Sequence, residues 1–102
     1  MNDRRLYNTS NYDIDIFAQG TAESKFGFVT AYPGRNVWVF IEGDELLTLR
    51  ANIVIDKGVN SSVIFSQELK ASPGGYLYNI FNRKEIAINI NYDQDFFEFI
   101  IT

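Results

Sequence analysis

Apolar and polar residues alternate along several short stretches of the chain. Between residues 12 and 18, apolar side chains occupy the even positions, and Asp13 and Asp15 occupy two of the odd ones. The same period of two recurs between residues 47 and 55 and again between residues 86 and 92. This period is typical of a strand with one buried face. With the remaining apolar segments, the pattern predicts strands over residues 12–18, 26–32, 37–42, 47–55, 76–81, 86–92 and 96–101.

The segment of residues 61–71 fits two structures. Val63, Phe65 and Leu69 suit a strand, because β-branched and aromatic residues favour a pleated surface. The same segment suits a short helix, with Ser61 or Ser62 as the N-cap and good helix formers at residues 67–70. We favour the strand and keep a short helix near residues 61–71 as the alternative.

Turn residues separate these segments. Tyr32-Pro33-Gly34-Arg35 and Ser72-Pro73-Gly74-Gly75 both place Pro and Gly at the central positions of a type II turn. Because loops this short usually join antiparallel neighbours, the chain predicts an all-β fold. We expect an antiparallel meander of seven or eight strands, closed into a small barrel or folded into a sandwich. A single β domain is expected over residues 11–102, with residues 1–10 as a flexible arm.

Composition limits the chemistry that the chain can perform. The 102 residues include no His and no Cys, so the most common neutral-pH base and the thiolate nucleophile are missing. We therefore expect no enzyme and no cofactor. The net charge of −4 disfavours nucleic acid and anionic membranes as partners. No apolar segment follows Arg4 and Arg5 as in a signal peptide, and no apolar run approaches membrane-spanning length, so a cytoplasmic or virion location is expected.

The chain carries two similar segments near its ends. Residues 11–17 read NYDIDIF and residues 91–97 read NYDQDFF. If the first and last strands paired, the carboxylates of Asp13, Asp15, Asp93 and Asp95 could converge on a calcium ion, which prefers oxygen ligands. No EF-hand spacing accompanies these aspartates, so calcium binding is a secondary hypothesis and no metal site is assigned.

The strongest anomaly is an excess of large apolar side chains. In residues 37–42, Val37, Val39 and Ile41 share one face, which leaves Trp38 and Phe40 on the other. Residues 76–81 and 96–101 likewise carry apolar side chains on both faces. A sheet with one side in water should not place Trp and Phe on that side. Either these strands are covered on both faces within the molecule, or the second face binds a partner.

These observations predict a noncatalytic protein–protein interaction or assembly module that binds a second copy or another protein. Such a module would suit a viral or mobile-element accessory protein. The alternative is a β-barrel that binds a small apolar ligand or a carbohydrate through the same aromatic residues. The candidate contact residues in either case are Trp38, Phe40, Tyr76, Tyr78, Ile80 and Phe96.

Overall fold

The computed structural model describes residues 3–21, 23–59, 61–93 and 96–102. These residues form eight strands and one short helix. The elements are β1 (Asp3–Asn8), β2 (Ile14–Gln19), β3 (Gly27–Ala31), β4 (Asn36–Phe40), β5 (Thr48–Gly58), β6 (Ser61–Lys70), α1 (Tyr76–Phe81), β7 (Glu85–Asp93) and β8 (Phe96–Ile101). The all-β class predicted from the alternating pattern is confirmed.

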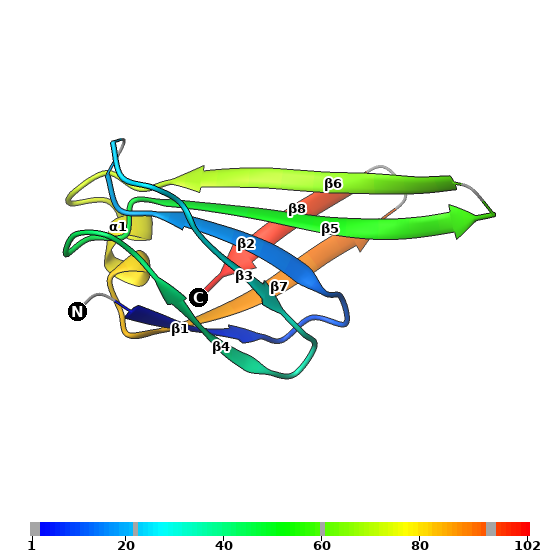
Figure 1. Ribbon diagram of the computed structural model, residues 1–102, viewed down its shortest axis with the longest axis horizontal. Helices are drawn as coiled ribbons and strands as arrows, with labels where there is room; N and C mark the ends of the chain where they lie inside the picture. The colour runs from blue at the N-terminus through cyan, green and yellow to red at the C-terminus, as the bar shows by residue number, and fades with distance from the viewer. Residues whose placement is uncertain (1–2, 22, 60, 94–95) are drawn as a thin grey trace.

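The strands lie in two four-stranded sheets that pack face to face (Figure 1). We call them sheet A, with the order β4-β1-β7-β8, and sheet B, with the order β3-β2-β5-β6. In the described part of the chain the sheets do not close into a barrel. Of the two architectures expected from the sequence, the structure is therefore the sandwich.

The strand order differs from the expected meander. The chain runs from β1 in sheet A to β2 and β3 in sheet B, returns for β4, crosses again for β5 and β6, and ends with β7 and β8 in sheet A. As a result β1 pairs with β7 in parallel. A short loop predicts an antiparallel neighbour only if both strands share a sheet. Facing sheets lie only about 10 Å apart, so a loop of a few residues can also cross between them.

The N-terminal segment is not the flexible arm that its polar sequence suggested. Asp3–Asn8 forms β1, which lies between β4 and β7 in the interior of sheet A. Its inward side chains are Arg4, Leu6 and Asn8, all buried. Because two of these three are polar, the strand lacks the apolar alternation on which the other predictions rested.

Two further predictions, for residues 61–71 and residues 76–81, can be compared directly with the structure. Residues 61–70 form the strand β6, as favoured, rather than the alternative helix. The strand predicted over residues 76–81 is wrong, because Tyr76–Phe81 is the helix α1. Leu77, Ile80 and Phe81 follow the i, i+3, i+4 spacing of a helix with one apolar face, and that face packs on the core. The helix ends at Phe81. The backbone N–H of the next residue, Asn82, donates to the carbonyl oxygen of Tyr78 and so closes the last turn.

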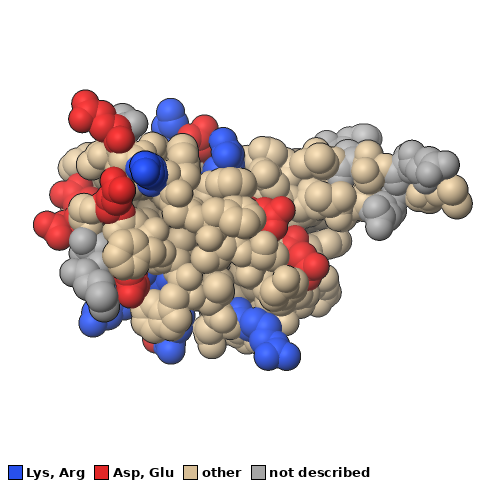
Figure 2. All heavy atoms as spheres, viewed as in Figure 1, with Lys and Arg blue, Asp and Glu red and all other residues tan. Residues whose placement is uncertain are grey.

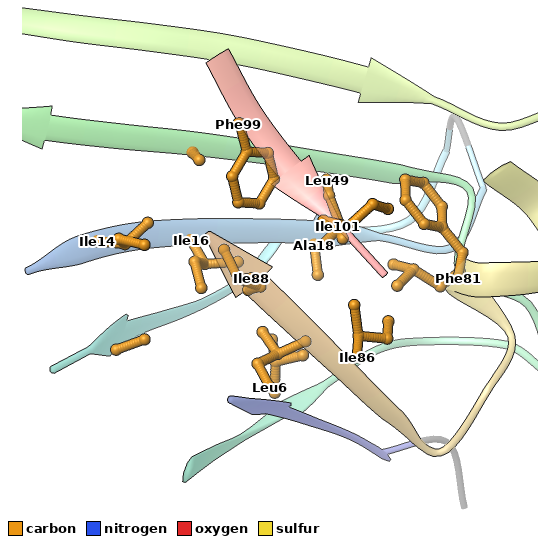
Figure 3. Close-up of a cluster of buried hydrophobic side chains, with 14 of the residues drawn as sticks. Leu6, Ile14, Ile16, Ala18, Leu49, Phe81, Ile86, Ile88, Phe99 and Ile101 are labelled. Atoms are coloured by element: carbon orange, nitrogen blue, oxygen red, sulfur yellow. The ribbon is translucent and has the colours of Figure 1, made fainter. Parts of the chain in front are cut away.

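The hydrophobic core fills the space between the sheets. Figure 3 shows Leu6, Ile16, Ala18, Ile86 and Ile88 directed into this space, together with Phe81 from α1. All six side chains are fully buried. The helix therefore covers one open end of the sandwich, near both chain termini (Figure 1). No helix within the described residues is long and apolar enough to cross a membrane.

Arg4 fixes the helix to β1. Its Nε donates to the carbonyl oxygen of Phe81 at 3.1 Å, and its Nη2 donates to Asn82 Oδ1 at 3.0 Å and to the carbonyl oxygen of Asp44 at 3.3 Å. Burial lowers the pKa of the Arg4 guanidinium, and the nearby Asp3 carboxylate partly opposes this effect. The guanidinium nevertheless stays charged, because an arginine is not deprotonated in proteins. It therefore ties three separate segments together at the helix end of the sandwich.

Contacts join the two sheets along both sides of the sandwich. On one side β3 approaches β4 so closely that a Cβ atom on Gly27 would lie 2.1 Å from the carbonyl oxygen of Phe40. On the other side, Gln67 of β6 reaches over β8, where its Oε1 accepts a hydrogen bond from the backbone N–H of Phe99 at 2.6 Å. The hairpin of β5 and β6 continues past the other strands and lengthens the molecule to 44 × 24 × 22 Å (Figure 1, Figure 2).

Candidate functional site: an aromatic face of sheet A

Trp38 and Phe40 lie on the outer face of sheet A, as the alternation within residues 37–42 predicted. Val39, between them in the sequence, is fully buried, whereas Trp38 is 57% exposed and Phe40 is 62% exposed. Both side chains belong to β4, an edge strand whose only pairing is with β1 in the described residues. The structure therefore leaves the second apolar face of this segment uncovered.

The neighbouring strand adds a third aromatic residue and a charge. The pairing of β1 with β4 places Arg5 opposite Trp38 and Tyr7 one row further along the same face. The Arg5 guanidinium carbon lies 6.0 Å from the centroid of the Trp38 ring, within the range of a cation–π contact. We call Tyr7, Trp38, Phe40 and Arg5 the Trp38 patch.

The position of Arg5 is set by its other neighbour. The parallel pairing of β1 with β7 places Glu85 beside Arg5, and the two side chains form an ion pair. Both are partly exposed, so the pair contributes little to stability. The two pairings place Arg5 between Trp38 and Glu85, so its guanidinium lies next to the aromatic rings.

A hollow of about 350 Å³ borders the patch. Arg5 and Tyr7 of β1 line it, with Asn36 of β4, residues 85–87 of β7 and Thr102. The lining combines one aromatic ring with amide, hydroxyl, carboxylate and guanidinium groups. These groups can exchange hydrogen bonds with a polar ligand or with the backbone of a partner.

The three candidates on α1 have separate positions. Tyr76 is 75% exposed and lines a second hollow, beside Leu77, the inner face of β6 and the end of β8. Tyr78 hydrogen-bonds to the Glu45 carboxylate, which raises the pKa of the Tyr78 phenol. Ile80 is 2% exposed and belongs to the core, so its assignment to an interface is wrong. That assignment assumed a strand, in which residues 76, 78 and 80 would share a face; a helix turns them apart.

Phe96 is exposed but lies far from Trp38. It is 48% exposed on the outer face of sheet A and pairs with Asp93, at the opposite end of β7 from Glu85. Glu85 and Asp93 are eight positions apart, which corresponds to about 26 Å along the strand. The structure therefore brings together Trp38 and Phe40 but not Tyr76, Tyr78 or Phe96.

The proposed calcium ligands do not form a cluster. Asp13 and Asp15 lie in or beside β2 of sheet B, whereas Asp93 ends β7 of sheet A. Asp15 Oδ1 accepts a hydrogen bond from the Thr30 hydroxyl at 2.9 Å. Among the described residues no group of three or more acidic side chains could hold a metal ion, and Asp95 lies outside those residues. The two similar segments do meet, through the rings of Tyr12 and Tyr92 at 6.0 Å.

Sequence reasoning missed a second aromatic cluster, on the outer face of sheet B. Phe17 packs on Phe28 with ring centroids 4.8 Å apart, and the Arg50 guanidinium carbon lies 4.4 Å from Phe17 and 5.3 Å from Phe26. The alternation that indicates this cluster is visible in the sequence, where Phe26, just before β3, and Phe28 flank Gly27. These rings contact one another, although Phe26 and Phe28 remain exposed, whereas Trp38 and Phe40 take part in no ring–ring contact among the described residues.

The chain matches no protein family model, no curated protein and no solved structure.

Proposed function

We propose that this protein is a noncatalytic binding module and that the Trp38 patch is the surface with which it contacts another protein chain. The observation that carries the proposal is the exposure of Trp38 and Phe40 on a strand whose inward residue between them, Val39, is fully buried. Trp, Tyr and Arg are the residues most enriched at the energetic centres of interfaces. All three types are neighbours in this patch.

The size of the patch limits the strength of the contact. Each aromatic side chain offers about 150–250 Å², so three of them at roughly half exposure present about 300 Å². A standard interface buries about 800 Å² on each partner. The aromatic rings can therefore form the centre of an interface, while the surrounding polar residues of the hollow supply its rim.

The free energy of burying these rings also limits the strength of the contact. Removing about 300 Å² of apolar surface from water yields about 6–10 kcal/mol. Loss of translational and rotational freedom costs about 4–15 kcal/mol. The aromatic contact alone is thus insufficient for a tight complex, and hydrogen bonds from Tyr7, Asn36 and Arg5 must contribute to it.

Trp38 offers a direct experiment because it is the only tryptophan in the chain. If the partner is a second copy, Trp38 emission shifts to the blue and acrylamide quenching weakens as the protein concentration rises, while light scattering reports a larger species. Trp38→Asp abolishes that species. Tyr32→Asp, a change at an exposed residue just after β3, serves as the matched control and leaves it intact.

The hollow beside Tyr7 favours one further candidate, a small ligand such as a glycan. Its volume of about 350 Å³ falls within the usual range of ligand sites, about 300–1,000 Å³. In that case Trp38 emission shifts on addition of the ligand at constant solution mass. Emission that responds neither to protein concentration, nor to added proteins, nor to glycans or fatty acids would contradict both proposals.

A further inference from the structure

β6 exposes one long edge of the sandwich, and the main-chain bonding shows which residues form it. The backbone N–H of Ala71 donates to the carbonyl oxygen of Leu47, directly opposite it in the register of β5 and β6. Bonded and non-bonded pairs alternate in antiparallel strands. The odd-numbered residues of β6 therefore bond to β5, and the N–H and C=O groups of Ser62, Ile64, Ser66, Glu68 and Lys70 point away from the sheet.

The other three edges make contacts with the facing sheet in the described structure. The edges of β3 and β4 meet where Gly27 approaches the carbonyl oxygen of Phe40. On β8 the outward N–H of Phe99 is taken by the side chain of Gln67. No comparable contact covers the outward side of β6 among the described residues.

β6 also has few of the devices that usually protect an edge strand, and the register shift in its pairing lies on β5, between Asp56 and Gly58. Proteins commonly place Pro, a bulge or charged residues along such an edge. β6 contains no Pro, and its two charged residues, Glu68 and Lys70, lie at one end. The remaining outward side chains of this strand are short or apolar.

We infer that β6 pairs antiparallel with β6 of a second copy, with the two-fold axis at Ser66. In this register Ser66 faces its own equivalent, Ile64 faces Glu68 of the second copy, and Ser62 faces Lys70. Every outward residue of the strand then finds an outward partner. No like charges stand opposite each other, whereas an axis at Glu68 would oppose two carboxylates. The two B sheets become one continuous eight-stranded sheet.

The contact area predicts a weak dimer. The nine residues from Ser62 to Lys70 extend over about 30 Å, and a sheet is about 10 Å thick, so each copy contributes a strip of about 300 Å². A standard interface needs about 800 Å² on each side. We therefore expect association only at high protein concentration, and a covalent trap is the suitable assay.

The native chain has no Cys, so single cysteine variants report the register directly. Ser66→Cys places two thiols in a bonded pair with Cα atoms about 5.5 Å apart, within the range that a disulfide requires. Ser62→Cys is the matched control, because the same register separates its two copies by about 27 Å. Under mild oxidation Ser66→Cys should form a covalent dimer at least tenfold faster than Ser62→Cys.

Two results would overturn this inference. One is a Ser66→Cys variant that stays monomeric at high concentration, and the other is equal dimer formation by both variants, as random collision would produce. The Ser66→Cys dimer should persist when Trp38→Asp is added, because the β6 edge and the Trp38 patch lie in different sheets. If Trp38→Asp abolishes the disulfide, the copies associate through the patch and the β6 register is wrong. Far-ultraviolet circular dichroism of the reduced variants confirms that each is folded.

Discussion

Replacing Asn8 with alanine tests how far the turn between β1 and β2 depends on one buried amide. Asn8 is fully buried, and its side chain makes four hydrogen bonds. Nδ2 donates to the carbonyl oxygens of Tyr12 at 2.7 Å and Ala31 at 2.8 Å. Oδ1 accepts from the backbone N–H of Ser10 at 2.9 Å and from the Ser10 hydroxyl at 2.6 Å. The amide thus joins β1 of sheet A to the turn before β2 and to the last residue of β3.

The expected loss follows from the groups left without this partner. In Asn8→Ala the carbonyl oxygen of Tyr12 keeps a bond from the Ser10 hydroxyl at 3.3 Å. The carbonyl oxygen of Ala31 and the N–H of Ser10 lose the bonds that Asn8 supplied. Each buried group left unpaired costs about 1–3 kcal/mol, so the free energy of unfolding should fall by about 2–5 kcal/mol. Asn8→Asp should cost at least as much, because it directs a carboxylate at two carbonyl oxygens.

Urea denaturation followed by circular dichroism measures this difference. With a slope of about 1–3 kcal/mol per molar urea, the midpoint should fall by about 1 M or more. Asn11→Ala, in the same turn but exposed, is the control and should stay within about 0.5 kcal/mol of the wild type. An Asn8→Ala variant as stable as this control would mean that the four bonds make no net contribution to the free energy of unfolding.

Four further substitutions test other parts of the structure. Trp38→Asp should change the free energy of unfolding by less than about 1 kcal/mol because Trp38 is largely exposed, whereas Ile80→Ala should lower it by about 2–5 kcal/mol; chemical denaturation compares the two. Gly27→Ala should lower the melting temperature by several degrees, because the new Cβ would meet a β4 carbonyl oxygen; an unchanged melting temperature would contradict the close approach of β3 and β4. Glu45→Gln should shift the ultraviolet titration of the Tyr78 phenol to lower pH, because the carboxylate that favours the protonated phenol is gone; an unchanged titration would show that no such bond exists in solution.

The alternating pattern was enough to place most strands because a period of two requires only that one face be buried. Ile14, Ile16 and Ala18 were assigned to a strand in this way and are fully buried. The pattern also separated Val39 from Trp38 and Phe40, which is how the central residues of the candidate site were found. Burial of one face of a strand can therefore be predicted from the local sequence.

The remaining features depend on contacts between segments far apart in the sequence, which a local pattern cannot predict. β1 was missed because Arg4 and Asn8 are inward residues whose polar groups are satisfied by distant segments. The helix α1 was missed because the apolar residues 77, 80 and 81 are compatible with a short two-faced strand as well as with one helical face. The parallel pairing of β1 with β7 could not follow from loop length, since short loops also cross between facing sheets.

Site-specific photo-crosslinking tests most directly whether the Trp38 patch binds another protein chain. A photoreactive amino acid replaces Trp38 in one variant and Tyr32 in the other, and both variants are irradiated in the cells that naturally produce the protein. If the Trp38 patch binds another protein chain, we expect a discrete protein adduct from position 38, formed with a second copy or with one other protein, and none from position 32. Absence of any adduct at position 38, or the same adducts at both positions, would contradict it.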